Sequence, residues 1–267
     1  MSIQEELLSS RKTIDALLSC IMDMGELLLT SGAEVVRVED TIRRLCTAYG
    51  FARTDVFSIT SSIVVTVQDK DGQVFTQTRR ISARDTDLQK VALVNSLSRQ
   101  VCVTPIGVEE FRERLDSIRQ TKAYPLPLQC FGYALISAVF AVFFGGTWMD
   151  GVAAALSGIL IFVTQLVLGK LRLNNLLQSV LISAFTAFVV VVMVHFGIGD
   201  SPAKITIGNI MLLIPGIAFT TSLRDLISGD TISGLIGICE AMVKAIAIAI
   251  GFALVLVQAG GILRHHK

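Results

Sequence analysis

Histidine and paired cysteine, which build many catalytic and zinc sites, are scarce in this sequence. Its three histidines are His195, His265 and His266, so residues 1–194 cannot supply a histidine base to a serine or cysteine nucleophile. The five cysteines are scattered without a CxxC pair, which is typical of isolated buried thiols and not of a disulfide framework or zinc site. A glycine-rich phosphate loop is also missing. We therefore expect no enzyme activity, metal or cofactor, although lysine- or carboxylate-based chemistry stays open.

Charge is scarce after Pro125. Of the 45 charged side chains, 33 precede that residue, and neither part is basic enough to suggest a nucleic-acid partner. The first residues, MSIQEELLSSRKTIDALL, contain no basic segment followed by an unbroken apolar run, so we expect no secretory signal. The sequence predicts a cytoplasmic domain at residues 1–124 and a transmembrane domain at residues 125–267.

Five apolar stretches follow Pro125, and each approaches the roughly 20 residues that a helix needs to cross a bilayer. The Lys/Arg bias of the flanking segments, seven on the side of the first domain against three opposite, predicts a cytoplasmic N-terminus in a multi-pass protein of the cell membrane. Many transporters pair two repeats around the substrate, so five spans are consistent with half of one. The stretches are Leu128–Phe144, Gly151–Leu168, Leu176–Phe196, Ile205–Ser222 and Leu235–Val257.

The fourth stretch is interrupted by Pro215-Gly216. Proline removes a backbone donor and clashes with the preceding turn, and glycine reaches conformations closed to other residues, so the helix should kink or unwind. Unwound backbone at membrane depth is tolerated only inside protein or along a polar cavity, which points to transport. The polar groups expected at this candidate substrate site are Asn209, Thr220, Thr221, Arg224, Asp225 and Asp230.

Arg224 is the strongest candidate because its planar guanidinium suits a carboxylate. The alternative is a plain packing kink, with Arg224 a positive-inside anchor paired with Asp225. The fourth stretch could also be re-entrant.

The fifth stretch combines a small-residue stripe with two charges. Glu240 and Lys244 lie four residues apart, in the favourable order for an ion pair, and either form a structural pair or handle substrate or protons. The stripe would let another helix approach closely, with ordinary packing within the chain as the alternative. It consists of Gly237, Ala241, Ala245, Ala249 and Ala253.

The first domain reads as α+β. Periodic apolar residues predict a helix at residues 5–29, and alternation with β-branched residues predicts short strands at 55–59, 63–67 and 74–78, with a turn at Asp71-Gly72. Helices should resume at 84–100 and 108–121. Ser31 and Glu34 match a capping box that would open a helix running to about Tyr49, and solvated ion pairing is the usual explanation for Arg37 and Glu39.

Two stretches, SGAEVVRVEDTIRRLCTAYG from Ser31 and IPGIAFTTSLRDLISGDTISG from Ile214, resemble the threonine/serine exporter family. The resemblance covers essentially the whole chain as the family's N-terminal half, a cytoplasmic domain followed by five transmembrane helices. Single-chain members continue into a second five-helix region. The first motif contains Ser31, Gly32, Glu34, Arg37 and Glu39, and the second contains Pro215, Gly216, Arg224, Asp225, Gly229 and Asp230.

The chain also resembles the larger subunit of a two-subunit bacterial succinate exporter, in which a small five-helix membrane protein supplies the other half. The resemblance implies export of a small carboxylate-bearing metabolite, such as threonine, serine or succinate, by an oligomer in the lipid bilayer. Our leading hypothesis is therefore an exporter subunit with a carboxylate site near the break. A membrane-anchored regulatory or scaffold protein is the alternative, and a membrane-tethered enzyme is a third.

Overall fold

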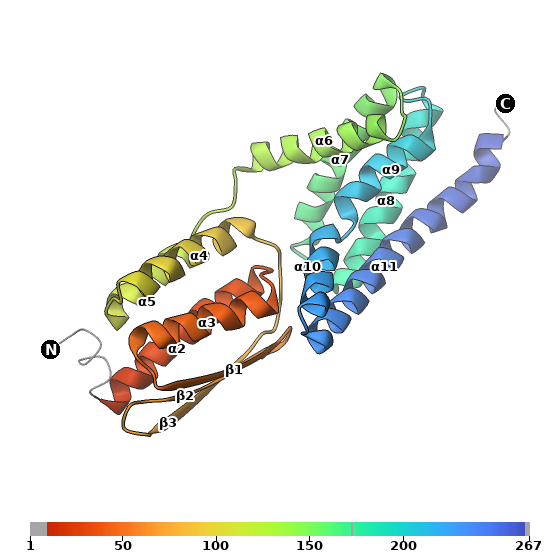
Figure 1. Cartoon of the computed structure of the whole chain (residues 1–267). Coiled ribbons are helices and arrows are strands. Elements are labelled where there is room, and N and C mark those ends of the chain that lie inside the picture. Colours follow the sequence, from red (N-terminus) through yellow and green to blue (C-terminus); the bar gives the residue numbers. More distant parts are fainter. Residues whose placement is uncertain (1–9, 172, 265–267) are drawn as a thin grey trace. The chain divides into compact units, whose positions relative to one another are not determined.

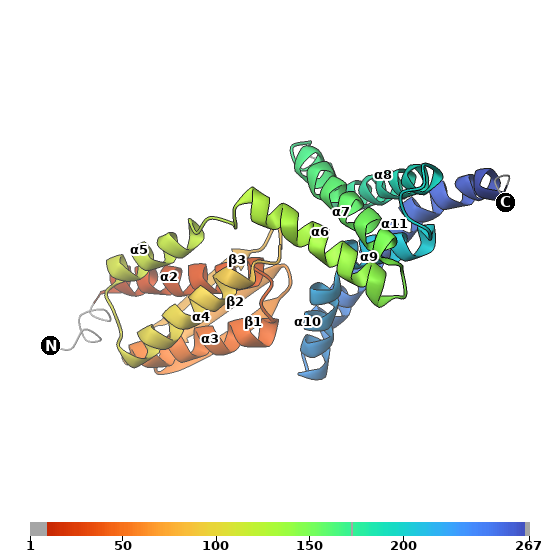
Figure 2. The ribbon, with the colours of Figure 1, turned by 90° about the horizontal axis from the view of Figure 1, so that it is seen from above.

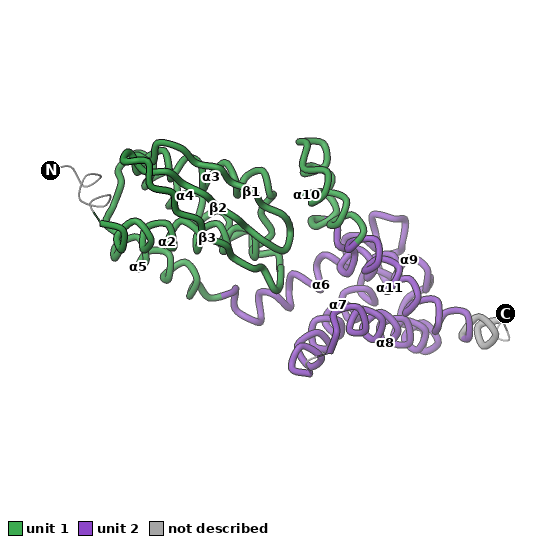
Figure 3. The backbone as a smooth tube through the Cα atoms, turned by 90° about the horizontal axis from the view of Figure 1, so that it is seen from below, with its two compact units in different colours: residues 1–122, 217–239 green, residues 123–216, 240–267 purple. Residues whose placement is uncertain are grey.

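The computed structural model describes residues 10–171 and 173–264 and divides the chain into two compact units (Figures 1 and 3). The first unit comprises Met1–Lys122 together with Ile217–Cys239, and the second comprises Ala123–Gly216 with Glu240–Lys267. The first unit therefore adds a segment from the carboxyl-terminal half of the chain to the amino-terminal α+β segment.

Helices α2 and α3 form the middle layer of the first unit, between a three-stranded sheet and the pair α4 and α5 (Figures 1 and 2). The antiparallel sheet has the order β1-β2-β3. The bounds are α2 Arg11–Thr30, α3 Val35–Tyr49, β1 Arg53–Ile59, β2 Ser62–Gln68, β3 Val74–Arg80, α4 Leu88–Val103 and α5 Val108–Arg119.

This layering explains why α2 is apolar on almost every side. Its buried residues include Leu17, Leu18 and Met24, which are 0% exposed. A helix that is hydrophobic all round needs neighbours on all sides, and α2 contacts the sheet, α3, α4 and α5. On β2, Ile63 and Val65 face the helices and are fully buried, because strand side chains alternate between the two faces.

The predicted strands and the hairpin turn at Asp71-Gly72 are confirmed, and Gly72 has the positive φ that the turn requires. The predicted amino-terminal helix is also found, but it begins at Arg11 in the described chain, and residues 5–9 of the prediction lie outside the described residues. The helix predicted from residue 84 begins at Leu88. Asp87 precedes it and caps it by accepting a hydrogen bond from the Lys90 amide at 3.0 Å.

The second unit contains α6 Leu126–Phe143, α7 Trp148–Leu168, α8 Asn175–His195 and α9 Pro202–Leu213, with the later part of α11 Thr231–Arg264. Among the described residues, α6, α7, α8 and α11 are long and apolar enough to cross a membrane, and α9 with α10 Gly216–Ile227 makes a fifth span if the bent pair counts as one. The prediction of several long apolar helices is therefore confirmed.

The predicted interruption of the fourth stretch is confirmed. Helix α9 ends at Leu213, α10 begins at Gly216, and the two helices are bent by 54°. Gly216 does not adopt a positive φ, and a Cβ built there would meet no described atom within 4 Å, so the break does not require glycine at this position. Pro215, which cannot donate to the helix and disfavours helical geometry at Ile214, accounts for the break by itself.

The small-residue stripe on α11 packs only at its beginning. Gly237 and Ala241 are buried, whereas Ala249 and Ala253 are exposed. A step of four residues overshoots one helical turn by about 40°, so the stripe winds about 160° around the helix between Gly237 and Ala253. Later contacts use a different face, where Gly251 lies so close to Ser183 of α8 that a Cβ would collide with its hydroxyl.

Candidate functional site

The two motif stretches meet in the first unit, although about 190 residues separate them in the sequence. The Arg224 Nη1 donates to Glu34 Oε1 at 2.5 Å, and the Val35 amide donates to Asp225 Oδ1 at 3.0 Å. Two neighbouring residues of the first motif therefore bind two neighbouring residues of the second. We call Glu34, Val35, Arg224 and Asp225 the motif junction.

The chain before Glu34 forms a tight turn. Gly32 has φ +89°, a conformation that favours glycine, and a Cβ there would lie 2.9 Å from the Asp85 carbonyl oxygen. The amides of Asp85 and Asp87 donate to the carbonyls of Thr30 and Ser31 at 2.8 and 3.0 Å. The segment before α4 therefore holds, through these two hydrogen bonds, the turn between α2 and α3, and this turn places the start of α3 next to Asp225.

The predicted capping box is wrong. Ser31 is the buried C-cap of α2, and Glu34 occupies the N-cap position of α3, where the described structure shows no cap hydrogen bond from its side chain. The carboxylate of Asp225 takes the capping role from another part of the chain, because it accepts the Val35 amide at the start of the helix. The first amides of a helix have no partner within the helix, and a carboxylate there also interacts favourably with the helix dipole.

Asp225 and Arg224 differ sharply in exposure. Asp225 is 2% exposed, and Arg84 lies close enough to attract its carboxylate. The Arg224 side chain is 58% exposed, whereas that of its partner Glu34 is 16% exposed. Removing a capping carboxylate costs about 0.5–2 kcal/mol, whereas an exposed ion pair contributes about 0–1 kcal/mol. Asp225 is thus the buried anchor of the motif junction, and the Glu34–Arg224 pair is its more exposed contact.

Comparison with known proteins places these two motifs in a family. The family model ThrE, which describes threonine/serine exporters, matches residues 19–258. The chain belongs to the threonine/serine exporter family. The long apolar helices of the described structure fit a membrane protein of that family.

Curated relatives fall into two groups. The threonine/serine exporter of Corynebacterium glutamicum is 24% identical over 85% of this chain and 48% of its own length, and the probable threonine/serine exporter of Mycobacterium tuberculosis is 24% identical over 93% and 46%. The chain thus spans about half the length of these exporters. It also shares 24% identity with the probable succinate transporter subunit YjjP of Klebsiella aerogenes, over 87% of this chain and 90% of that protein. No solved structure matches the chain.

Two further acidic residues of the motifs, Glu39 and Asp230, lie near the motif junction. Glu39 of α3 accepts a hydrogen bond from the Ser58 amide at 2.7 Å and pairs with Arg43 at 3.9 Å. Burial raises the pKa of Glu39 above its ordinary value, the Ser58 hydrogen bond opposes this rise, and the negative charge of Asp230 adds to it. Asp230 lies at the start of α11, where its amide donates to the Asp225 carbonyl at 3.0 Å. Glu39 therefore holds β1 against α3, and its carboxylate is already engaged by groups of the protein.

Arg37 extends the motif junction on α3. Its Nη2 lies 4.0 Å from Glu34 Oε2, and its side chain is 45% exposed. The Glu34 carboxylate therefore faces two arginines, one from each motif. Sequence reasoning selected all three residues separately but did not predict that they meet.

The remaining predicted residues of the break do not converge on the motif junction. Thr221 donates to Ile217 and Ala218 of its own helix at 3.1 Å, and Thr220 and Gly216 are exposed. Pro215 is partly buried.

Glu240 and Lys244 are both exposed on α11. The described part of the chain contains no ion pair between them within 4.0 Å, so the structural pair that their spacing suggested is absent there. Their role in handling protons or substrate stays a prediction.

Asn209 lies in the second unit and is 0% exposed. Its Oδ1 accepts hydrogen bonds from Ser137 of α6 at 2.9 Å and from Ser157 of α7 at 3.0 Å, which are both buried. Ser137 and Ser157 were missed by sequence reasoning, although each lies in an apolar stretch where a hydroxyl needs a partner. This polar cluster joins three helices and is satisfied internally, so Asn209 is a packing residue in this structure.

Close backbone approach supports the same helix crossing. A Cβ at Gly208 would lie 2.5 Å from the Ser137 carbonyl oxygen, and a Cβ at Gly158 would lie 2.7 Å from that of Tyr133. Small residues at such crossings let helices pack closely enough for side-chain hydrogen bonds to form between them.

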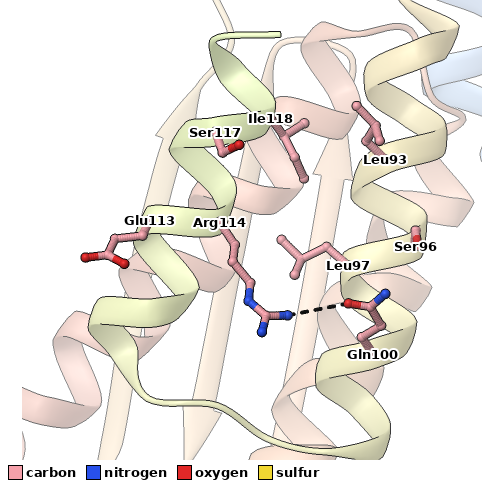
Figure 4. Close-up of a pocket in the computed structure, with 8 residues that line it drawn as sticks. All are labelled: Leu93, Ser96, Leu97, Gln100, Glu113, Arg114, Ser117 and Ile118. Carbon is pink, nitrogen blue, oxygen red and sulfur yellow. Dashed lines mark hydrogen bonds between the residues drawn. The ribbon is translucent and has the colours of Figure 1, made fainter.

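A separate cavity of about 360 Å³ lies between α4 and α5 in the first unit (Figure 4). Arg114 points toward Gln100 across it and donates to the Gln100 side chain at 3.4 Å and to Glu110 at 2.5 Å. Its charge is therefore already compensated on α5. The motif junction, which unites both motifs, is the stronger candidate site. The cavity is lined by Leu93, Ser96, Leu97, Gln100, Glu113, Arg114, Ser117 and Ile118.

Proposed function

We propose that this chain is a subunit of an exporter for a small carboxylate-bearing metabolite of the threonine, serine or succinate class, and that a small five-helix membrane protein completes the transporter. The family assignment supports export. A relative that aligns over 90% of its length is named a transporter subunit, which supports a partner. Four long apolar helices and the bent α9–α10 pair, counted as one span, would give the five spans of one half of a paired transporter.

One observation carries the proposed site. Arg224 holds a carboxylate, that of Glu34, while more than half of its side chain stays exposed, on the helix that begins directly after the Pro215 break. A guanidinium presents several donors in a fixed plane and binds carboxylates with two parallel hydrogen bonds. In our proposal, the substrate carboxylate binds Arg224 at the cytoplasmic side, and Asp225 keeps α10 attached to α3.

Other residues have supporting roles in the proposal. Asp230 and Glu39 hold the start of α11 and the sheet beside α3. Glu240 and Lys244 are the candidates for coupling transport to protons, because ionisable groups on a membrane helix are costly unless they function or find partners. The amino-terminal α+β segment would lie in the cytoplasm and regulate access to Arg224.

Efflux from loaded cells tests this proposal. Cells that contain labelled succinate, threonine or serine would express the chain alone, a five-helix partner alone, or both. We expect efflux of at least one substrate only when both are present. Efflux by the chain alone would refute the need for a partner, and the absence of efflux of all three substrates from the pair would contradict the function.

Arg224→Gln tests the site within the same assay. Loss of a charged hydrogen bond of about 1.5–3 kcal/mol should lower efflux per molecule about tenfold or more. Arg44→Gln is the matched control, because Arg44 is also an exposed arginine that pairs with a carboxylate, Asp40, at 2.8 Å. Equal efflux from Arg224→Gln and Arg44→Gln, at equal amounts in the membrane, would refute the role of Arg224.

A further inference from the structure

The Glu34 carboxylate binds the guanidinium of Arg224, which is the group that the substrate carboxylate would bind in the proposed function. Its Oε1 accepts from Arg224, and its Oε2 lies 4.0 Å from Arg37. We propose that Glu34 is an internal competitor for Arg224, and that a substrate carboxylate is captured by exchange with it. This inference rests on the proposed function, and it identifies Glu34 as a residue that sets the apparent affinity for substrate.

The geometry allows this exchange without separating α10 from α3. Glu34 and Val35 are consecutive, and they contact the consecutive residues Arg224 and Asp225. Breaking the Glu34–Arg224 contact leaves the hydrogen bond from Val35 to the buried Asp225 carboxylate intact. The α10 helix can therefore stay docked while Arg224 changes partner.

The exposure of Arg224 lowers the free-energy cost of exchanging its carboxylate partner. The Arg224 side chain is 58% exposed, and an ion pair in such a position shifts an equilibrium by up to about fivefold. Arg37 provides Glu34 with a second cation, so the Glu34 charge keeps a partner after Arg224 leaves. A free carboxylate that binds both donors of the guanidinium fork can replace this contact at substrate concentrations above its dissociation constant.

Two substitutions on α3 should change apparent affinity in opposite directions. In Glu34→Gln the competing charge is lost, so the KM for efflux should fall by up to about fivefold. In Arg37→Gln the alternative partner of Glu34 is lost, so Glu34 should hold Arg224 more firmly and KM should rise. Glu34 makes no cap hydrogen bond among the described residues, so its substitution leaves the α3 cap in place.

The experiment measures efflux against internal substrate concentration for the chain together with its partner. Glu110→Gln is the matched control, because Glu110 pairs with Arg114 at 2.5 Å on the surface of α5. The KM of the Glu110→Gln variant should equal that of the wild type. An unchanged KM in both Glu34→Gln and Arg37→Gln, with normal wild-type efflux, would overturn the competitor role and leave the exporter proposal intact. A raised KM in Glu34→Gln would also overturn it. Absence of wild-type efflux would overturn both proposals.

Discussion

The capping of α3 by Asp225 makes a sharp prediction about Asp225→Ala. The Val35 amide is at the first position of the helix, where no intrahelical acceptor exists, and the Asp225 carboxylate at 3.0 Å is its partner. Loss of a capping side chain costs about 0.5–2 kcal/mol, with part of this value arising from the interaction with the helix dipole. A change of about 1–2 kcal/mol corresponds to a factor of about 5–30 in local opening.

Hydrogen–deuterium exchange of the full chain in detergent measures this effect directly. In Asp225→Ala, peptides that cover the first turn of α3 should exchange about 5–30 times faster, whereas the β2 peptides should keep their protection. Asp225→Asn retains an acceptor oxygen, so the exchange rate of the first turn of α3 in this variant should fall between those of the wild type and of Asp225→Ala. Thermal unfolding of the first unit should shift by about 2–4 °C for each 1 kcal/mol lost.

A local cap provides the control for this experiment. Asp87 caps α4 through the Lys90 amide at 3.0 Å, so Asp87→Ala should accelerate exchange at the start of α4 and leave α3 protected. Unchanged exchange in the first turn of α3 in Asp225→Ala would refute the contact between the two motifs. Equal acceleration throughout the first unit would show global destabilisation and would also count against a specific cap.

Two further predictions concern packing and pH. Gly208→Ala should destabilise the chain by about 1–3 kcal/mol, because its Cβ would meet a backbone oxygen at 2.5 Å. Gly216→Ala should be neutral or should stabilise the chain by up to about 1 kcal/mol. Equal losses of thermal stability in the two variants, measured in detergent, would contradict this prediction. Burial raises the pKa of Glu39, so its contribution to stability is fully present below its unfolded pKa of about 4.3 and is lost as pH rises through the folded value. Thermal stability should therefore decline less between pH 4 and 7 in Glu39→Gln than in the wild type, and parallel curves would refute the shift.

Local rules predicted the elements of this fold well. Alternation marked the strands, apolar runs marked the membrane helices, and Pro215 marked the break, because each of these signals acts within a few residues. At the break the sequence offered two helix breakers, and Gly216 does not use its conformational freedom, so the proline accounts for the break. A residue that permits an unusual conformation does not have to adopt it.

Long-range partners explain the errors at the candidate site. Ser31 and Glu34 have the spacing of a capping box, but Asp225 approaches from the second motif and takes over the cap. No pattern within the first motif could reveal this, because the competing group lies in a distant part of the sequence. Asn209 was predicted as a polar group of the substrate site because it lies near the break in an apolar stretch. Its partners Ser137 and Ser157 turn it into a packing contact.

A charge swap at the motif junction tests the central claim that Arg224 serves both Glu34 and the substrate. Glu34→Arg and Arg224→Glu each place like charges together and should weaken the contact, and the double variant should restore the ion pair and its thermal stability. Efflux by the chain with its partner is the deciding measurement. We predict that the stable double variant exports no carboxylate above background, because the exposed guanidinium has moved from α10 to α3. Recovery of efflux in the double variant would contradict the account, since it would reduce Arg224 to a structural partner of Glu34.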